Sequence, residues 1–78
     1  QDGSYLAEFL PVAPERLKPH AHPGVEFIYV VSGKLSVHID EVEHTLAAGD
    51  SMYFDSGQPH AYRRSGGQTC RAVVVTAG

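Results

Sequence analysis

The sequence predicts one small all-β domain, a sandwich or barrel of seven to eight short antiparallel strands. Three observations support this fold class. Apolar and polar residues alternate in short runs, Gly- or Pro-containing turns recur every eight to twelve residues, and no segment between turns has the length and period of an ordinary helix. A chain of 78 residues is enough for a single domain, which we take to be residues 1–78.

The first half of the chain predicts three extended segments. Residues 4–12 form a first strand that ends in a proline-containing stretch at 11–14. Residues 16–22 are expected to be extended, interrupted at Pro19 and closed by a Pro-Gly turn. Residues 25–31 are rich in β-branched and aromatic side chains, and Ser32-Gly33 turns the chain.

The second half predicts five more short strands. Strict alternation over 35–39 indicates a half-buried strand, and Asp40-Glu41 is the expected turn into the next one. The remaining strands are predicted at 42–46, 51–54, 60–64 and 69–76, separated by turns or loops at 48–50, 55–59 and 65–67.

Composition excludes several classes of function. The net charge of −3 and the scattered basic residues argue against direct nucleic-acid contact from this segment. No apolar run approaches 18 residues, so no membrane helix is expected, and the single cysteine fits a reducing cytoplasm. A core this small leaves the fold marginal, so we expect support from a metal, a partner subunit or a longer parent chain.

Histidines and a glutamate form the chemically informative pattern. His20 and His22 share one face of an extended segment, and Glu26 re-enters on the next strand after the Pro-Gly bend. His60 follows a Gly- and Pro-containing loop that can return it to the same centre. Three imidazoles and one carboxylate suit a divalent transition metal (Fe, Mn, Ni, Co, Cu or Zn) and leave coordination positions open. A solvated or hydrogen-bonded role is the alternative for each histidine alone.

The spacing of these residues resembles the cupin superfamily. His20-x-His22-x-x-x-Glu26 followed by Gly33 is similar to the first cupin motif, and Gly49 with Gly57-Gln58-Pro59-His60 is similar to the second. The resemblance implies a double-stranded β-helix, the jelly-roll barrel of cupins, with His20, His22, Glu26 and His60 as metal ligands. Three turn-forming positions depart from the family pattern, at Glu15-Arg16, Asp55 and Arg64, and none of them is a ligand position.

Side chains in phase with the ligands define an expected pocket, for which ordinary core packing is the alternative in each case. The expected pocket residues are Ile28, Val30, Met52, Phe54 and Tyr62. The opposite face of the 25–31 strand carries Phe27, Tyr29 and Val31, which are either covered by the preceding segment or exposed as the interface of a homodimer. We expect the homodimer.

The remaining histidines and the cysteine are assigned structural roles. His38 alternates out of phase with its apolar neighbours and is expected to face water, and His44 is expected to be partly buried or at a rim. Cys70 is interpreted as a small buried apolar residue, because nothing near it in sequence suggests an activating base.

Three functions fit the pattern. Residues 26–33, 49–56 and 59–63 resemble the C-terminal cupin domain of bacterial helix-turn-helix (XRE-type) transcription regulators, which implies a small-molecule effector-sensing domain. The absence of an initiator methionine is compatible with such a fragment. The alternative is a stand-alone mononuclear metalloenzyme, a dioxygenase, isomerase or lyase, in which Glu26 is a displaceable ligand and Tyr62 a hydrogen-bond donor to substrate. A storage or structural barrel with a vestigial site is the third reading.

Overall fold

A computed structural model describes residues 2–78 as seven antiparallel strands in two sheets. The four-stranded sheet has the order β1-β7-β2-β5, and the three-stranded sheet has the order β4-β3-β6. The strands are β1 (Gly3–Phe9), β2 (Val25–Ser32), β3 (Lys34–Ile39), β4 (Val42–Ala47), β5 (Ser51–Asp55), β6 (His60–Ser65) and β7 (Cys70–Ala77). The predicted all-β jelly-roll architecture is confirmed.

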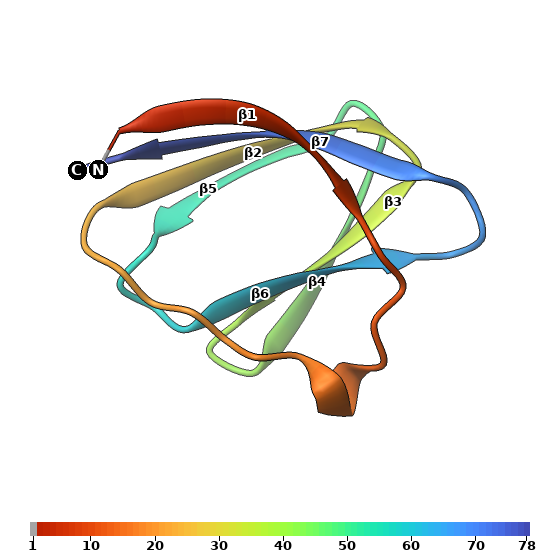
Figure 1. Cartoon of the computed structure of the whole chain (residues 1–78), viewed down its shortest axis with the longest axis horizontal. Coiled ribbons are helices and arrows are strands. Elements are labelled where there is room, and N and C mark those ends of the chain that lie inside the picture. Colours follow the sequence, from red (N-terminus) through yellow and green to blue (C-terminus); the bar gives the residue numbers. More distant parts are fainter. Residues whose placement is uncertain (1) are drawn as a thin grey trace.

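The core lies between the two sheets. Figure 1 shows the four-stranded sheet crossing over the three-stranded one, with the two ends of the chain together beside β1 and β7. Alternation places one face of each strand inward, as the sequence pattern required. The core residues are Ile28, Val30, Phe54, Cys70, Ala72 and Val74 from the first sheet and Leu35, Val37 and Ile39 from the second. Cys70 is buried as expected, and burial raises the pKa of its thiol.

Two turns contain residues whose backbone conformation explains why the sequence predicted a turn there. Asp40 and Glu41 both have positive φ, 48° and 67°, as a tight two-residue hairpin turn requires. Gly33 has φ of 74°, and a Cβ there would lie 2.5 Å from the Thr69 carbonyl oxygen. Only glycine fits this close approach of two chain segments without displacing backbone.

One predicted segment differs. Residues 16–22 do not form a strand: the only regular structure near them is a short 3-10 helix, η1 (Pro14–Arg16), and His20 makes one isolated antiparallel bridge with His60. Proline begins η1 at Pro14 and removes a backbone donor again at Pro19, so this stretch cannot pair continuously with a sheet. It becomes the irregular loop that runs below β6 in Figure 1.

The outer face of the four-stranded sheet is apolar and exposed. Phe27, Tyr29 and Val31 are 36, 42 and 50% exposed, so the preceding segment does not cover them. The register adds Tyr53 of β5 beside Phe27, and Val73 of β7 beside Tyr29. The homodimer expected on this face stays a prediction.

Among the described residues, no helix has the length and hydropathy needed to span a bilayer.

Candidate metal centre

The loop that carries the first two histidines is fixed by backbone hydrogen bonds. His20 and His60 exchange two N–H···O bonds of 2.9 Å each, and the His22 amide donates to the Ser56 carbonyl at 2.9 Å. Gly24 continues this anchoring, because its carbonyl accepts from the Ser56 amide. These contacts hold the loop against the start of β6, where His60 lies.

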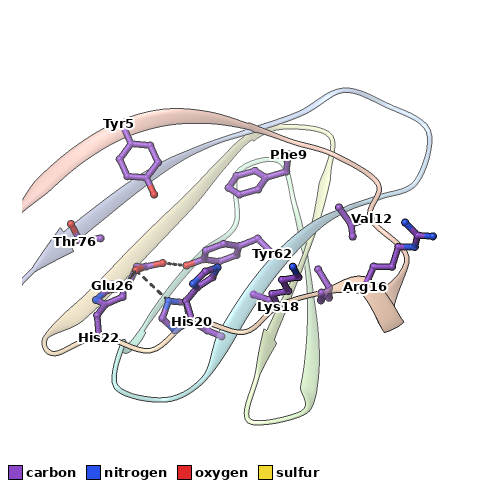
Figure 2. A pocket seen from close by; sticks show the side chains of 13 residues that line it. Tyr5, Phe9, Val12, Arg16, Lys18, His20, His22, Glu26, Tyr62 and Thr76 are labelled. Atoms are coloured by element: carbon purple, nitrogen blue, oxygen red, sulfur yellow. Dashed lines mark hydrogen bonds and ion pairs between the residues drawn. The ribbon is translucent and has the colours of Figure 1, made fainter.

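Glu26 is the centre of the site. It stands near the start of β2, points inward, and is only 3% exposed. Its Oε1 lies 3.3 Å from His22 Nε2 and 3.6 Å from His60 Nε2, and its Oε2 accepts a hydrogen bond from the Tyr62 hydroxyl. Figure 2 shows His22 and Tyr62 on either side of the Glu26 carboxylate. No lysine or arginine of the described residues forms an ion pair with this buried carboxylate.

The orientation of His60 indicates that a cation belongs here. Its Nδ1 lies 2.7 Å from the Gln58 carbonyl oxygen, which can only accept, so Nδ1 carries the hydrogen. A neutral His60 therefore turns the lone pair of Nε2 toward the Glu26 oxygen 3.6 Å away. Two electron-pair donors face each other stably only when a proton or metal ion lies between them. A second nitrogen held by a backbone carbonyl is also the usual arrangement of a metal-binding imidazole.

The donor separations fit a metal ion. One ligand atom from each of His22, Glu26 and His60 lies within 4.8 Å of the others. Metal–nitrogen and metal–oxygen bonds of about 2.0–2.2 Å place neighbouring ligand atoms roughly 3–4 Å apart. Small side-chain movements are enough to reach that geometry, and His22 is free to move because its side chain is 42% exposed.

His20 stands outside this three-residue cluster. Its side chain lines the same cavity, and its backbone is tied to His60. The structure thus brings three of the four predicted ligands together and leaves His20 at the cavity wall beside them (Figure 2).

A cavity of about 580 Å³ opens above the cluster. Of the five pocket residues expected from the sequence, Tyr62 lines this cavity. The others lie deeper: Ile28, Val30 and Phe54 belong to the core, and Met52 packs against it. Phe54 still contacts the site from below, with its ring centroid 5.1 Å from that of His60 in an edge-on arrangement.

Tyr5 lines the cavity and had no predicted role. It pairs with Val74 across β1 and β7, so both side chains share the inward face. Figure 2 shows its hydroxyl pointing toward Glu26. Burial, and secondarily the charge of Glu26, raise the pKa of Tyr5. The sequence signal that could have identified Tyr5 is its alternation with Ala7 and Phe9 on one face of the first strand.

The other two histidines lie away from the cluster. His38 is half-buried rather than fully in water, because Arg63 Nε donates to its Nε2 at 3.2 Å and Glu43 Oε2 lies 3.7 Å from that atom. Arg63 and Ser36 both donate to Glu43 as well, at 2.8 and 2.7 Å. His44 is half-buried on β4, opposite Val37.

Fold and site together define a class, a small jelly-roll barrel with a candidate mononuclear metal centre at the open end of its core. The chain matches the cupin domain family over residues 8–76. It belongs to that family, as the spacing of its motifs predicted.

Similar proteins include two Streptomyces proteins and an epoxidase of known structure. The chain is 35% identical over 60 residues to Protein SchB of Streptomyces halstedii and to Polyketide synthase CurC of Streptomyces cyaneus, covering 76% of this chain in both cases. It spans 44% of the first relative and 39% of the second, less than half of either. Hydroxypropylphosphonic acid epoxidase from S. wedmorenis superposes with a TM-score of 0.84 at 24% identity, over 95% of this chain and 42% of that one.

Two further structures of that enzyme carry information on its metal. A structure of Fe(II) HppE in complex with substrate has a TM-score of 0.83 at 25% identity, over 95% of this chain and 44% of that one. A Co(II) HppE structure with substrate superposes equally well, at 24% identity over 95% of this chain and 43% of that one. Here the likeness establishes the shared fold.

Proposed function

We propose that this domain binds one divalent transition metal through His22, Glu26 and His60, with His20 as fourth ligand, and acts on a small organic molecule as a mononuclear metalloenzyme. The observation that carries the proposal is the buried Glu26 carboxylate, which faces two imidazole Nε2 atoms and has no lysine or arginine partner in the part of the chain that the structure describes. A buried carboxylate in this state is costly unless a cation compensates it.

The roles of the surrounding residues follow from their contacts. The Gln58 carbonyl fixes the ring orientation of His60, and the Tyr62 hydroxyl holds the Glu26 carboxylate. A bound divalent ion would supply Lewis acidity and, if redox-active, electron transfer. The substrate enters through the cavity above the cluster, whose wall includes Tyr5 and Phe9.

The relatives favour an enzyme of polyketide metabolism over the other metalloenzyme roles. One of them is named as a polyketide synthase, and the alignment includes most of this chain. We therefore place the substrate among the polyketides and their cyclised products. This assignment is part of the proposal.

The test is metal content together with turnover. Protein purified without chelators should hold about one transition-metal ion per chain by elemental mass spectrometry, and His60→Ala should lower metal affinity by roughly 10-fold or more. His38→Ala is the matched control, because His38 contacts Arg63 and Glu43 instead of the cluster. Wild-type stoichiometry in His60→Ala, or metal loss in His38→Ala, would refute the assignment.

The effector-sensing domain of a helix-turn-helix regulator is the second candidate. The resemblance of residues 26–33, 49–56 and 59–63 to such domains favours it. A sensor binds its ligand unchanged, whereas an enzyme converts it. Incubating metal-loaded protein with extracts of polyketide-producing cultures and following consumed compounds by mass spectrometry separates the two: metal-dependent consumption supports the enzyme, and retention without conversion supports the sensor.

A further inference from the structure

Lys18 is placed to select the charge of the bound molecule. Lys18, His20 and His22 all line the cavity, because the irregular loop that carries them runs along its edge. Figure 2 shows Lys18 reaching into the pocket from the same segment as His20, whereas the Arg16 guanidinium points away from it. Arg16 also lines the cavity, but with its guanidinium directed outward the amino group of Lys18 is the cation that points into it.

The charges of the pocket are unbalanced at this end. Among residues 2–78, Glu26 is the only acidic residue that lines the cavity, and it is already engaged with His22, His60 and Tyr62. Within residues 2–78, no carboxylate lies at ion-pair distance from Lys18. An incoming anion therefore finds a cation that no protein group neutralises.

The space between Lys18 and the cluster is lined by apolar side chains. Phe9, Val12 and Leu17 form part of the wall, and Phe9 packs at 5.3 Å, centroid to centroid, on Tyr62. Lys18 and His22 are four residues apart, so their Cα atoms are separated by at most about 13 Å. After allowance for the reach of both side chains, the gap is at most on the order of 5–10 Å, the length of one or two fused aromatic rings.

We propose that the pocket takes an organic anion with a flat apolar body, whose carboxylate is bound by Lys18 at the cavity mouth while its other end faces Glu26 and the two histidines. This inference rests on the proposed function, since it names the substrate class of the same site. An acidic aromatic product of polyketide cyclisation has this chemistry.

The experiment compares 2-naphthoate with neutral 2-naphthamide, which have the same ring body. Dissociation constants are measured by isothermal titration on metal-loaded protein, and the metal content of every sample is determined. The wild type should bind naphthoate roughly three- to tenfold more tightly than naphthamide, as expected for one partly exposed charge pair. This preference should weaken as NaCl is raised.

Lys18→Met should abolish the preference and leave naphthamide binding unchanged. Lys34→Met is the matched control, because Lys34 is the only other lysine and lies at the start of β3, outside this cavity. Equal affinities for the two probes in the wild type, binding of neither, or a preference that survives in Lys18→Met would each overturn the inference. The last result would mean that the carboxylate of naphthoate binds at the candidate metal centre instead of at Lys18.

The metal analysis separates this inference from the proposed function. One ion per chain without a naphthoate preference would reject the anion pocket and leave the metal centre standing. A Lys18-dependent preference in protein that holds no metal would reject the metal centre and leave the anion pocket standing.

Discussion

The hydrogen bond from Tyr62 to Glu26 gives a direct prediction for the metal-free protein. Tyr62→Phe removes only the hydroxyl and leaves a buried carboxylate oxygen without its donor. A hydrogen bond to a charged group contributes about 1.5–3 kcal/mol, and the loss is not recovered from water at a residue 3% exposed. In a domain of this size each kcal/mol shifts Tm by about 4–8 °C, so Tm should fall by roughly 10–15 °C near the middle of that range.

A double-mutant cycle assigns this loss to the carboxylate. Glu26→Gln keeps the shape of the side chain but removes its charge, and a neutral hydrogen bond contributes only about 0.5–1.5 kcal/mol. In the Glu26→Gln background, Tyr62→Phe should therefore cost about 1–2 kcal/mol less than in the wild type. The assay is urea unfolding with chelator present throughout.

Tyr53→Phe is the control for removing a tyrosine hydroxyl as such. Tyr53 is 69% exposed on β5, so loss of its hydroxyl should change the free energy of unfolding by less than about 0.5 kcal/mol. If Tyr62→Phe costs as little as this control, or costs the same in both backgrounds, then Tyr62 does not hold the ionised Glu26 in solution.

Two further predictions concern the rest of the barrel. Hydrogen bonding from Ser36, assisted by Arg63, holds the pKa of Glu43 below its usual value of 4.5, so this carboxylate stabilises the fold above that pH and the contribution is lost as the pH falls through the lower, folded-state pKa. Glu43→Gln should therefore flatten the acid side of a stability–pH curve measured by urea unfolding, and an unchanged curve would contradict the assignment. We also propose that the apolar face containing Phe27 pairs two copies of the chain: sedimentation velocity should show a dimer of the 8.4 kDa chain that Phe27→Lys converts to monomer, whereas Val42→Lys, at an exposed apolar position of β4, should leave it intact. A wild-type monomer would rule this interface out.

Much of the fold could be predicted because its signals are local. Alternation marked the strands, and the turns carried residues with special backbone needs, such as Gly33. The stretch 16–22 was predicted to be extended, but Pro14 just before it and Pro19 within it deny it a continuous ladder. Its single bridge joins His20 to His60, 40 residues later, and no local pattern reports a contact of that range.

Depth within the barrel explains the difference between predicted and observed pocket residues. Period-two alternation assigns a face but not a position along the strand. Ile28 and Val30 share the face of Glu26 but lie farther along β2 within the core, where both are fully buried. The cavity is instead lined by residues whose placement depends on long-range pairing, such as Tyr5 through β7, and by the irregular loop that carries Lys18.

The candidate centre is divided between a rigid and an adjustable part. Glu26 and His60 are buried, stand on strands and have their orientation fixed by Tyr62 and the Gln58 carbonyl. The His22 side chain is 42% exposed and lies on the irregular loop that also carries His20. Burial of Glu26 beside His60 destabilises the protein as long as no cation compensates the carboxylate. The loop supplies the ligands that must move to bind an ion. Metal binding should therefore fix the loop to the barrel and raise the free energy of unfolding. A domain of 78 residues has a small core, so this contribution is a large part of its stability.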